Sequence, residues 1–241
     1  MGDRKAIFIT GGGSGIGRAV ALHFAERGWF VGLGDIDKSG LHETAELIGN
    51  GFVYSHVFDV RDRAAWDEAL EAFSVASGGR IDVVFNNAGI PLGGSLIENS
   101  PEEIERCLDI NLKGAFLLAQ AVGRRMIAQA GGSIINIASI SRAGNMGQSN
   151  YSAAKAGVSA LVPVWAKELA RYGIRCMGIA PGFIETEMTA SMKPEALEKM
   201  TAGIPLKRMG KPEEIASTVA FIFENDYVSG RMIEVDGALR L

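Results

Sequence analysis

The sequence has little cysteine and little histidine. Its 241 residues include two cysteines and three histidines. Neither Cys107 nor Cys176 belongs to a CxxC pair, so we expect two buried, reduced thiols. The histidines at positions 23, 42 and 56 are scattered and never spaced i, i+4. We therefore predict no metal site and do not expect histidine to serve as the catalytic base.

Long runs of charge or of apolar residues are also missing. The chain has 24 Lys and Arg against 28 Asp and Glu, a net charge of −4, and no basic cluster of the kind that binds nucleic acid. The apolar run at residues 6–9 is too short for a signal peptide, and no apolar stretch is long enough to cross a membrane. We expect a cytoplasmic protein that binds neither nucleic acid nor membrane.

Apolar strands alternate with amphipathic helices along the whole chain. This pattern predicts a single α/β domain over residues 1–241, with a doubly wound parallel sheet of the Rossmann type. The expected strands are 5–10, 29–34, 52–58, 81–85, 133–138, 174–179 and 231–235. The expected helices are 15–27, 39–48, 63–76, 101–129 and 151–172, followed by two helical stretches that flank Pro205.

A glycine-rich segment, T-G-G-G-S-G-I-G at 10–17, joins the first strand to the first helix. Glycines there permit a tight turn and let the backbone approach a pyrophosphate. The free N–H groups and the positive dipole end of the helix attract the same anion. Because the segment lies between a strand and a helix, it predicts a dinucleotide site and not a plain turn.

An acidic residue, Asp35, ends the second strand. It could accept hydrogen bonds from ribose hydroxyls and would repel a 2′-phosphate. Asp37 adds negative charge nearby, and the loop residue Ser14 is uncharged. We therefore favour NAD over NADP. Either carboxylate could instead cap the next helix, an interpretation that we prefer for Asp37 only. After the third strand, Asp59 could bind the adenine amine, or cap a helix, while Val60 packs near the ring.

Tyr151 and Lys155 lie four residues apart at the start of a helix and so share one face. A nearby ammonium should lower the pKa of the tyrosine and make it a usable acid/base. Ser139, at the end of the fifth strand, could hydrogen-bond a substrate oxygen. Most Tyr/Lys pairs at this spacing lie on a protein surface and have no catalytic role. Here the pair follows a dinucleotide loop and a serine at the end of a strand, and this context favours a catalytic role.

Together these motifs resemble the short-chain dehydrogenase/reductase family over nearly the whole chain. The matching motifs are T-G-G-G-S-G-I-G at 10–17, D-V at 59–60, N-N-A-G at 86–89, N at 111, S at 139, Y-S-A-A-K at 151–155, P-G-F-I-E-T at 181–186 and V-D-G at 235–237. The resemblance implies an enzyme that moves a hydride between a nicotinamide and a carbonyl or secondary alcohol.

The resemblance also implies a role for each residue. Tyr151 would be the acid/base, Lys155 would bind the nicotinamide ribose, Ser139 would orient the carbonyl and Asn111 would hold a water. The backbone of Ile184 and the side chain of Thr186 would contact the carboxamide. The implied cofactor residues are Gly11, Gly13, Ser14, Gly15, Ile16, Gly17, Asp35, Asp59, Val60, Asn86, Ala88, Gly89, Tyr151, Lys155, Pro181, Gly182, Ile184 and Thr186.

Two departures from the family pattern stand out. The gap from Ser139 to Tyr151 is one residue shorter than in many relatives, which makes Ser141 a lesser candidate for the substrate-orienting role. Pro163 falls inside the helix that carries Tyr151, so we predict a kink or a broken turn near Ser159. This helix often packs between subunits in relatives. We expect a homotetramer, with a dimer as the alternative.

Two other functions remain open. Residues 203–216 look closest to 3-oxoacyl-carrier-protein reductases, which usually prefer NADP. Such an enzyme would need a basic patch for its acidic carrier. Its candidates are Arg124, Arg125, Lys207, Arg208 and Lys211, though a solvated surface is the simpler interpretation. A regulator that senses NAD without turnover would be expected to lack the Tyr151–Lys155 pair, which is intact.

Residues 186–210 correspond to a substrate lid in this family. Several flexible side chains suggest an apolar-tolerant pocket, although methionines could equally pack the helices. The candidate pocket residues are Met146, Phe183, Met188 and Met192. A steroid, an acyl thioester, a sugar and a simple ketone all remain possible substrates.

Overall fold

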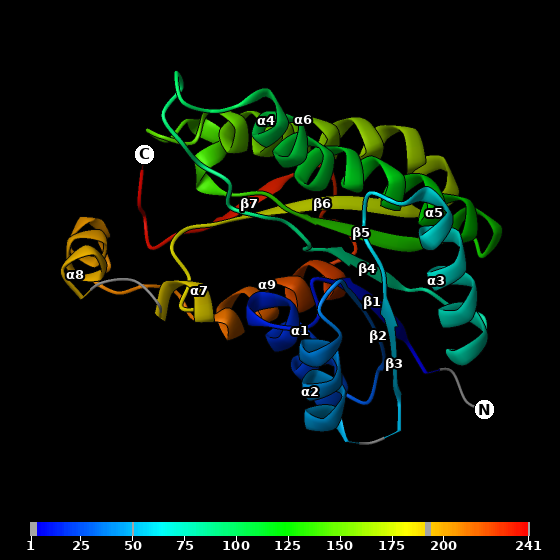
Figure 1. Cartoon of the computed structure of the whole chain (residues 1–241). Coiled ribbons are helices and arrows are strands. Elements are labelled where there is room, and N and C mark those ends of the chain that lie inside the picture. Colours follow the sequence, from blue (N-terminus) through cyan, green and yellow to red (C-terminus); the bar gives the residue numbers. More distant parts are fainter. Residues whose placement is uncertain (1–3, 50, 191–193, 241) are drawn as a thin grey trace.

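The computed structural model describes residues 4–49, 51–190 and 194–240. Seven parallel strands form one sheet in the order β3-β2-β1-β4-β5-β6-β7 (Figure 1). The strands are β1 Ala6–Thr10, β2 Phe30–Asp35, β3 Val53–Val57, β4 Val83–Asn86, β5 Gly132–Ile137, β6 Ile174–Pro181 and β7 Met232–Val235. The predicted fold class is confirmed, because parallel strands require crossovers and the chain supplies a helix for each.

Helices cover both faces of the sheet (Figure 1). One face carries α1 Gly15–Glu26, α2 Lys38–Ile48 and α9 Pro212–Glu224. The other carries α3 Arg63–Ala76, α5 Gly114–Ala128 and α6 Ser149–Leu169. Each layer closes its own apolar core, with Phe24 and Leu33 in the first and Phe8 and Trp66 in the second. Because both faces are covered, the central strand β1 is buried at every residue.

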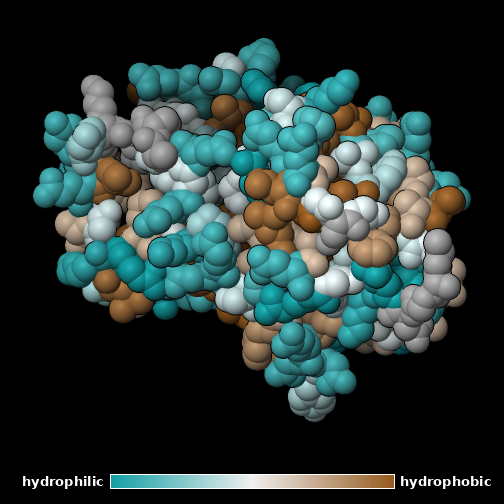
Figure 2. Space-filling model, turned by 90° about the horizontal axis from the view of Figure 1, so that it is seen from below, coloured by the Kyte–Doolittle hydropathy of each residue, from teal (hydrophilic) through white to brown (hydrophobic). Residues whose placement is uncertain are grey.

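The outer surface of the layer formed by α1, α2 and α9 faces solvent (Figure 2). Viewed from below, hydrophilic residues cover most of this face and apolar residues gather only in small patches (Figure 2). Such a surface is ordinary for the outside of an amphipathic helical layer. None of the helices in the described part of the chain is long and apolar enough to cross a membrane.

The predicted helix over 101–129 is wrong in one respect. The structure has α4 Pro101–Leu108, then a π-helical turn over Asp109–Lys113, then α5. The widened turn contains Asn111, whose amide nitrogen donates to the carbonyls of Ile90 and Cys107, each at 3.0 Å. Ile90 belongs to the segment after β4, far away in the sequence, so helical periodicity alone could not reveal this bond.

The break expected near Pro163 is also wrong. α6 is one continuous helix from Ser149 to Leu169 with Pro163 inside it. Proline removes one helical hydrogen bond, to the Ser159 carbonyl. The Ser159 hydroxyl donates to the Lys155 carbonyl at 2.8 Å, and the helix packs along β6 and α4. Tertiary packing keeps the helix intact.

Candidate active site

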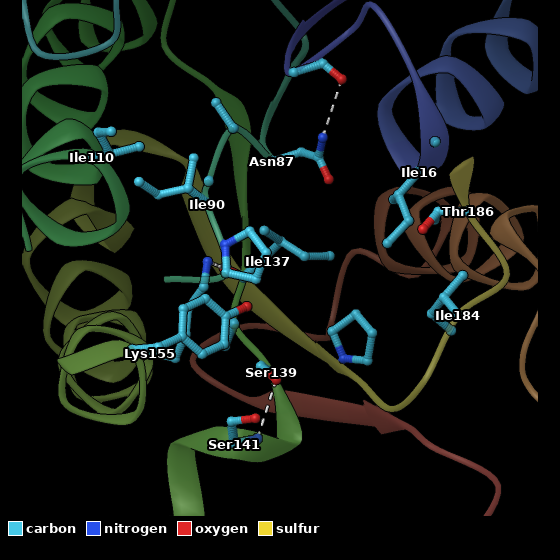
Figure 3. A pocket seen from close by; sticks show the side chains of 18 of the residues that line it. Ile16, Asn87, Ile90, Ile110, Ile137, Ser139, Ser141, Lys155, Ile184 and Thr186 are labelled. Carbon is cyan, nitrogen blue, oxygen red and sulfur yellow. Dashed lines mark hydrogen bonds between the residues drawn. The ribbon is translucent and has the colours of Figure 1, made fainter. Parts of the chain in front are cut away.

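A cavity of about 680 Å³ opens at the carboxyl ends of the strands. Ligands of doubly wound sheets bind at this edge. In Figure 3, Ile16, Ile184 and Thr186 line one side of it, with Ser139 and Lys155 across from them. The predicted site residues that line it are Gly11, Ser14, Gly15, Ile16, Asp35, Asp59, Val60, Ala88, Gly89, Ser139, Tyr151, Lys155, Pro181, Gly182, Ile184 and Thr186.

Four predicted site residues do not line the cavity but support residues that do. The N–H of Gly13 donates to the Asp35 carboxylate at 3.0 Å. Gly17 packs against the carbonyl of Gly11 so closely that a methyl group there would overlap it. Asn86 is buried and bonds Asn136 on the neighbouring strand at 3.1 Å. Asn111, the fourth, is buried in the π-helical turn.

The glycine turn is shaped for close approach of a ligand. Gly11 and Gly15 have φ of 65° and 50°, values that favour glycine. Ser14 precedes α1, and its side chain accepts no hydrogen bond from the described first turn. The Ser14 side chain thus leaves the N–H groups of that turn uncapped at the positive end of the helix dipole, and Ser14, Gly15 and Ile16 line the cavity there. This geometry suits a pyrophosphate.

Asp35 is held in place beside this turn. One carboxylate oxygen accepts the N–H of Gly13 at 3.0 Å and the other accepts the N–H of Asp37 at 3.1 Å. Asp37 instead caps α2 by accepting the N–H of Ser39 at 3.0 Å. The interpretation of Asp37 as a helix cap is confirmed, and Asp35 lines the cavity.

The acid after the third strand has a partner that sequence reasoning missed. Arg61 pairs with Asp59, with its Nη2 at 2.6 Å from the carboxylate. Hydrogen bonds from Arg61 hold the pKa of Asp59 below its usual range. The alternative that Asp59 caps the next helix is wrong, because Asp62 caps α3 through the N–H groups of Ala64 and Ala65.

The catalytic candidates meet at the centre of the cavity. Lys155 is 2% exposed, and its Nζ donates to the Ile137 carbonyl at 3.1 Å and lies 5.6 Å from the centre of the Tyr151 ring. Tyr151 hydrogen-bonds Ser139. The Ser139 Oγ also accepts the N–H of Ser141 at 3.1 Å (Figure 3). Ser139 is thus the serine that interacts with the phenol of Tyr151.

The predicted fall in the tyrosine pKa is wrong for this structure. Burial raises the pKa of Tyr151 to about 12, and the hydrogen bond with Ser139 only partly offsets that rise. Burial also lowers the pKa of Lys155 to about 8. Desolvation is the largest cause of both shifts and disfavours the charged form of each group. Tyr151 is therefore a neutral phenol at physiological pH, ready to donate a proton.

Asn111 holds the segment that follows β4 through two hydrogen bonds to the backbone of Ile90. Its carbonyl oxygen accepts the N–H of Ile90 at 3.2 Å while its amide nitrogen donates to the Ile90 carbonyl at 3.0 Å. A methyl group at Gly89 would come within 2.6 Å of the Asn111 oxygen and 3.4 Å of the Lys155 Nζ. The side chain of Asn111 thus fixes the cavity wall at Gly89 and Ile90.

The substrate side of the cavity is only partly as expected. Phe183 lines it, but Met146 is 98% exposed and lies outside the lining. The side chain of Met188 and the whole of Met192 lie outside the described residues. Sequence reasoning missed Met200, which does line the cavity, together with Asn145 and Gln148. The 186–210 segment contains the short helices α7 Glu187–Ala190 and α8 Pro194–Gly203.

Comparison with known proteins identifies the family. The family model described as enoyl-(acyl carrier protein) reductase matches residues 11–239. A 3-oxoacyl-acyl-carrier-protein reductase of Thermotoga maritima is 43% identical, with 98% of each chain covered. The chain belongs to the short-chain dehydrogenase/reductase family. It is an oxidoreductase of that type, which favours an enzyme over a regulator without turnover.

Other members of the short-chain dehydrogenase/reductase family carry different names. A (3R)-3-hydroxyacyl-CoA dehydrogenase of Rattus norvegicus is 40% identical over 96% of this chain and 94% of its own. The crystal structure of levodione reductase has a TM-score of 0.93 and 36% identity, covering 97% of this chain and 96% of its own. That of an actinorhodin polyketide ketoreductase variant with NADPH has a TM-score of 0.94 and 31% identity, covering 98% and 97%.

Some cavity residues of this dehydrogenase/reductase carried weaker sequence signals. Asn87 lies within the N-N-A-G motif, and its amide nitrogen donates to the Thr10 carbonyl at 3.0 Å. It could have been chosen from that motif. Ile36 lines the cavity although it is 71% exposed, and Arg61 lines it through its pairing with Asp59. Neither of these two has a pattern that a single sequence reveals.

Two glycine substitutions should separate close packing from mere helix content. We expect Gly17→Ala to lower the free energy of unfolding by about 1–3 kcal/mol and to weaken binding of the nicotinamide cofactor, because the added methyl overlaps the Gly11 carbonyl. Gly123 in α5 is the control: a methyl there meets no described atom within 4 Å, and Gly→Ala in a helix adds roughly 0.5–1 kcal/mol. Thermal unfolding and NADH fluorescence measure both. Equal effects of the two substitutions would contradict the packing argument.

The pKa of Lys155 predicts how reduction depends on pH. With the pKa lowered to about 8, the lysine carries its proton below that pH and loses it above, while Tyr151 stays protonated up to about 12. We therefore expect kcat/KM for the reduced nicotinamide cofactor, which reports ionisations of the free enzyme, to be level below pH 8 and to fall about tenfold per pH unit above it. A level profile to pH 10, or a fall centred near pH 6, would contradict this assignment.

Proposed function

We propose that this protein is an NAD(H)-dependent oxidoreductase that interconverts a ketone and a secondary alcohol, with Tyr151 as the acid/base. The observation that carries the proposal is a single cavity lined by Tyr151, Ser139 and Lys155 together with the glycine turn and Asp35. Each of these groups has a chemical task there.

In the direction of reduction, the carbonyl oxygen of the substrate accepts hydrogen bonds from Tyr151 and Ser139. Bound NADH supplies the hydride that the carbonyl carbon needs. Tyr151 gives its phenolic proton to the oxygen, which leaves the alcohol and a phenolate. The Lys155 ammonium, 5.6 Å from the centre of the Tyr151 ring, stabilises that phenolate. The hydrogen bond from Lys155 to the Ile137 carbonyl orients the ammonium. In oxidation Tyr151 takes the proton back.

The residues present fit NAD. The glycine turn lets the backbone approach a pyrophosphate, and the start of α1, which Ser14 leaves uncapped, lines the cavity with Gly15 and Ile16. Asp35 accepts two backbone N–H groups, which orient its carboxylate beside the glycine turn. A carboxylate at that place accepts the ribose hydroxyls and repels a 2′-phosphate. Asp35 therefore supports NAD over NADP.

For the substrate, we propose 3-oxoacyl or 3-hydroxyacyl thioesters. The names of the relatives from Thermotoga maritima and Rattus norvegicus support this class, and the apolar side chains of Ile140, Phe183 and Met200 in the cavity wall suit an acyl chain. The second candidate is an NADPH-dependent 3-oxoacyl-carrier-protein reductase. It is favoured by the relative from Thermotoga maritima and by the ketoreductase neighbour with NADPH.

One structural observation argues against the second candidate, the carrier-protein reductase. Arg125 near the end of α5 pairs with Glu71 of α3 at 2.7 Å, whereas Arg208 pairs with Glu214 at the start of α9 at 2.6 Å. α3 and α5 lie at the opposite end of the molecule from α8 (Figure 1). The five basic residues considered for a carrier therefore do not form one patch.

An absorbance assay tests the proposed reaction. The purified protein is given NADH with 3-oxoacyl thioesters of N-acetylcysteamine, simple ketones, a ketosteroid and a keto sugar, and NAD with the matching alcohols. We expect the fastest change in nicotinamide absorbance with the 3-oxoacyl thioesters, and reversal with the 3-hydroxyacyl thioesters. Faster turnover of the steroid or the sugar would contradict the substrate class, and no turnover of any carbonyl would contradict the reaction.

A further inference from the structure

Three large apolar side chains stand in water beside the mouth of the cavity. Leu96, Ile97 and Met146 are 76%, 92% and 98% exposed. Single exposed apolar residues are normal on a protein surface. These three, however, come from two loops that meet. One loop follows β4 and the other precedes α6, and both lie at the end of the molecule that carries α8 (Figure 1).

The two loops are fastened to each other. The N–H of Gly94 donates to the Gly147 carbonyl at 2.8 Å, and Gly94 pairs with Gln148 as a short parallel bridge. The contact is so close that a methyl group at Gly93 would come within 2.7 Å of the Gly147 oxygen. Asn99 braces the first loop by donating to the Gly94 carbonyl at 3.1 Å. The side chains of Leu96, Ile97 and Met146 therefore project from two loops that are held together. We call this apolar surface the rim.

The rim is continuous with the substrate side of the cavity. Asn145 and Gln148, which flank Met146, both line the cavity, and the Asn145 amide donates to the Gln148 side chain at 3.0 Å. On the other loop, Ile90 and Pro91 line the cavity a few residues before Leu96. Each of the two loops thus runs from the cavity wall out to the rim.

Part of the cavity wall is apolar as well. Ile140, Phe183 and Met200 line the cavity and belong to a third apolar cluster under the lid segment. Residues 92–99 and 144–148 contain no lysine or arginine and a single acid, Glu98. A ligand that leaves the cavity over this rim gains little from phosphate or sugar hydroxyls and much from CH₂ groups.

We propose that Leu96, Ile97 and Met146 bind the alkyl chain of the substrate where it leaves the cavity, and so make the enzyme selective for longer acyl chains. The inference rests on the proposed reaction for its substrate but concerns a separate surface. Each CH₂ group that reaches the rim is expected to raise affinity and kcat/KM by about two- to fourfold. Short chains end inside the cavity and gain nothing from the rim.

The test compares chain length in two variants. The double variant Ile97→Ser/Met146→Ser removes most of the rim, and Tyr227→Ser removes an apolar side chain that is 97% exposed and belongs to neither rim loop. For each protein, kcat/KM is measured with 3-oxoacyl thioesters of N-acetylcysteamine from about four to about ten carbons. The double variant should keep the wild-type rate on the shortest substrate and lose about tenfold or more on the longest. Tyr227→Ser should match the wild type throughout.

A binding readout separates this inference from the proposed reaction. Saturated thioesters have no keto group, and calorimetry with the NAD-loaded protein gives their affinity without turnover. Affinity that rises with chain length in the wild type but not in the double variant supports the rim, even if no ketone is reduced. Equal chain-length dependence in the two proteins overturns it. A change in sedimentation of the double variant, with unchanged affinities, would instead make the surface a subunit contact.

Discussion

Replacing Tyr151 with phenylalanine should lower kcat/KM for ketone reduction by about 10²–10⁴, the usual contribution of a positioned acid/base. Tyr151 hydrogen-bonds Ser139, and its high pKa keeps it protonated as the donor. The substitution removes one oxygen atom and leaves the ring in place, so the fold and the cofactor turn should be unaffected. Steady-state rates give kcat/KM for ketone reduction, and a fluorescence titration with NADH gives cofactor affinity separately.

Tyr227→Phe is the matched control, because that hydroxyl belongs to a side chain that is 97% exposed and does not line the cavity. It should change neither turnover nor NADH affinity. The assignment of Tyr151 would have to be abandoned if Tyr151→Phe reduced ketones at the wild-type rate. If Tyr151→Phe lowered NADH affinity as much as turnover, the acid/base role would also be contradicted, since Tyr151 would then serve mainly to bind the cofactor.

The second large effect is expected at Asp35. Asp35→Asn should raise the ratio of kcat/KM with NADPH to that with NADH by about 10²-fold. A carboxylate that faces a 2′-phosphate costs several kcal/mol, and the amide removes that repulsion. Asparagine keeps an oxygen that can accept the N–H of Gly13, so the glycine turn should hold its shape. Initial rates with both cofactors give the ratio.

Asp37→Asn is the control for this effect. It removes the same charge two residues away, from a side chain that caps α2 and does not line the cavity. The cofactor ratio of this variant should stay within a few-fold of the wild type. If both variants changed the ratio equally, the preference would come from the general negative charge of this corner of the molecule and not from Asp35 itself.

The features that sequence revealed are those held within one strand–turn–helix unit. The glycine turn, Asp35 at the end of β2 and the Tyr151–Lys155 pair at the start of α6 all depend on local spacing, and the structure brings them to one cavity. Parallel strands end at the same edge of a sheet, so residues that follow different strands were expected to meet.

The features that sequence missed depend on contacts between distant segments. The π-helical turn contains Asn111, which bonds Ile90 on a distant segment, and the pKa of Tyr151 rises because surrounding elements bury it. The Met146 side chain is exposed, on a loop that the bridge between Gly94 and Gln148 joins to the segment after β4. None of these follows from the spacing of residues along one element, because each depends on how two parts of the chain pack.

The most direct test of the proposed function is a parallel measurement of 3-oxoacyl thioester reduction by the wild-type protein with NADH and with NADPH. We predict turnover with both the thioester and NADH present, and a kcat/KM for NADH at least about tenfold above that for NADPH, because Asp35 is fixed beside the glycine turn. A preference for NADPH would contradict the assignment of Asp35 and make an NADPH-dependent 3-oxoacyl reductase the better description.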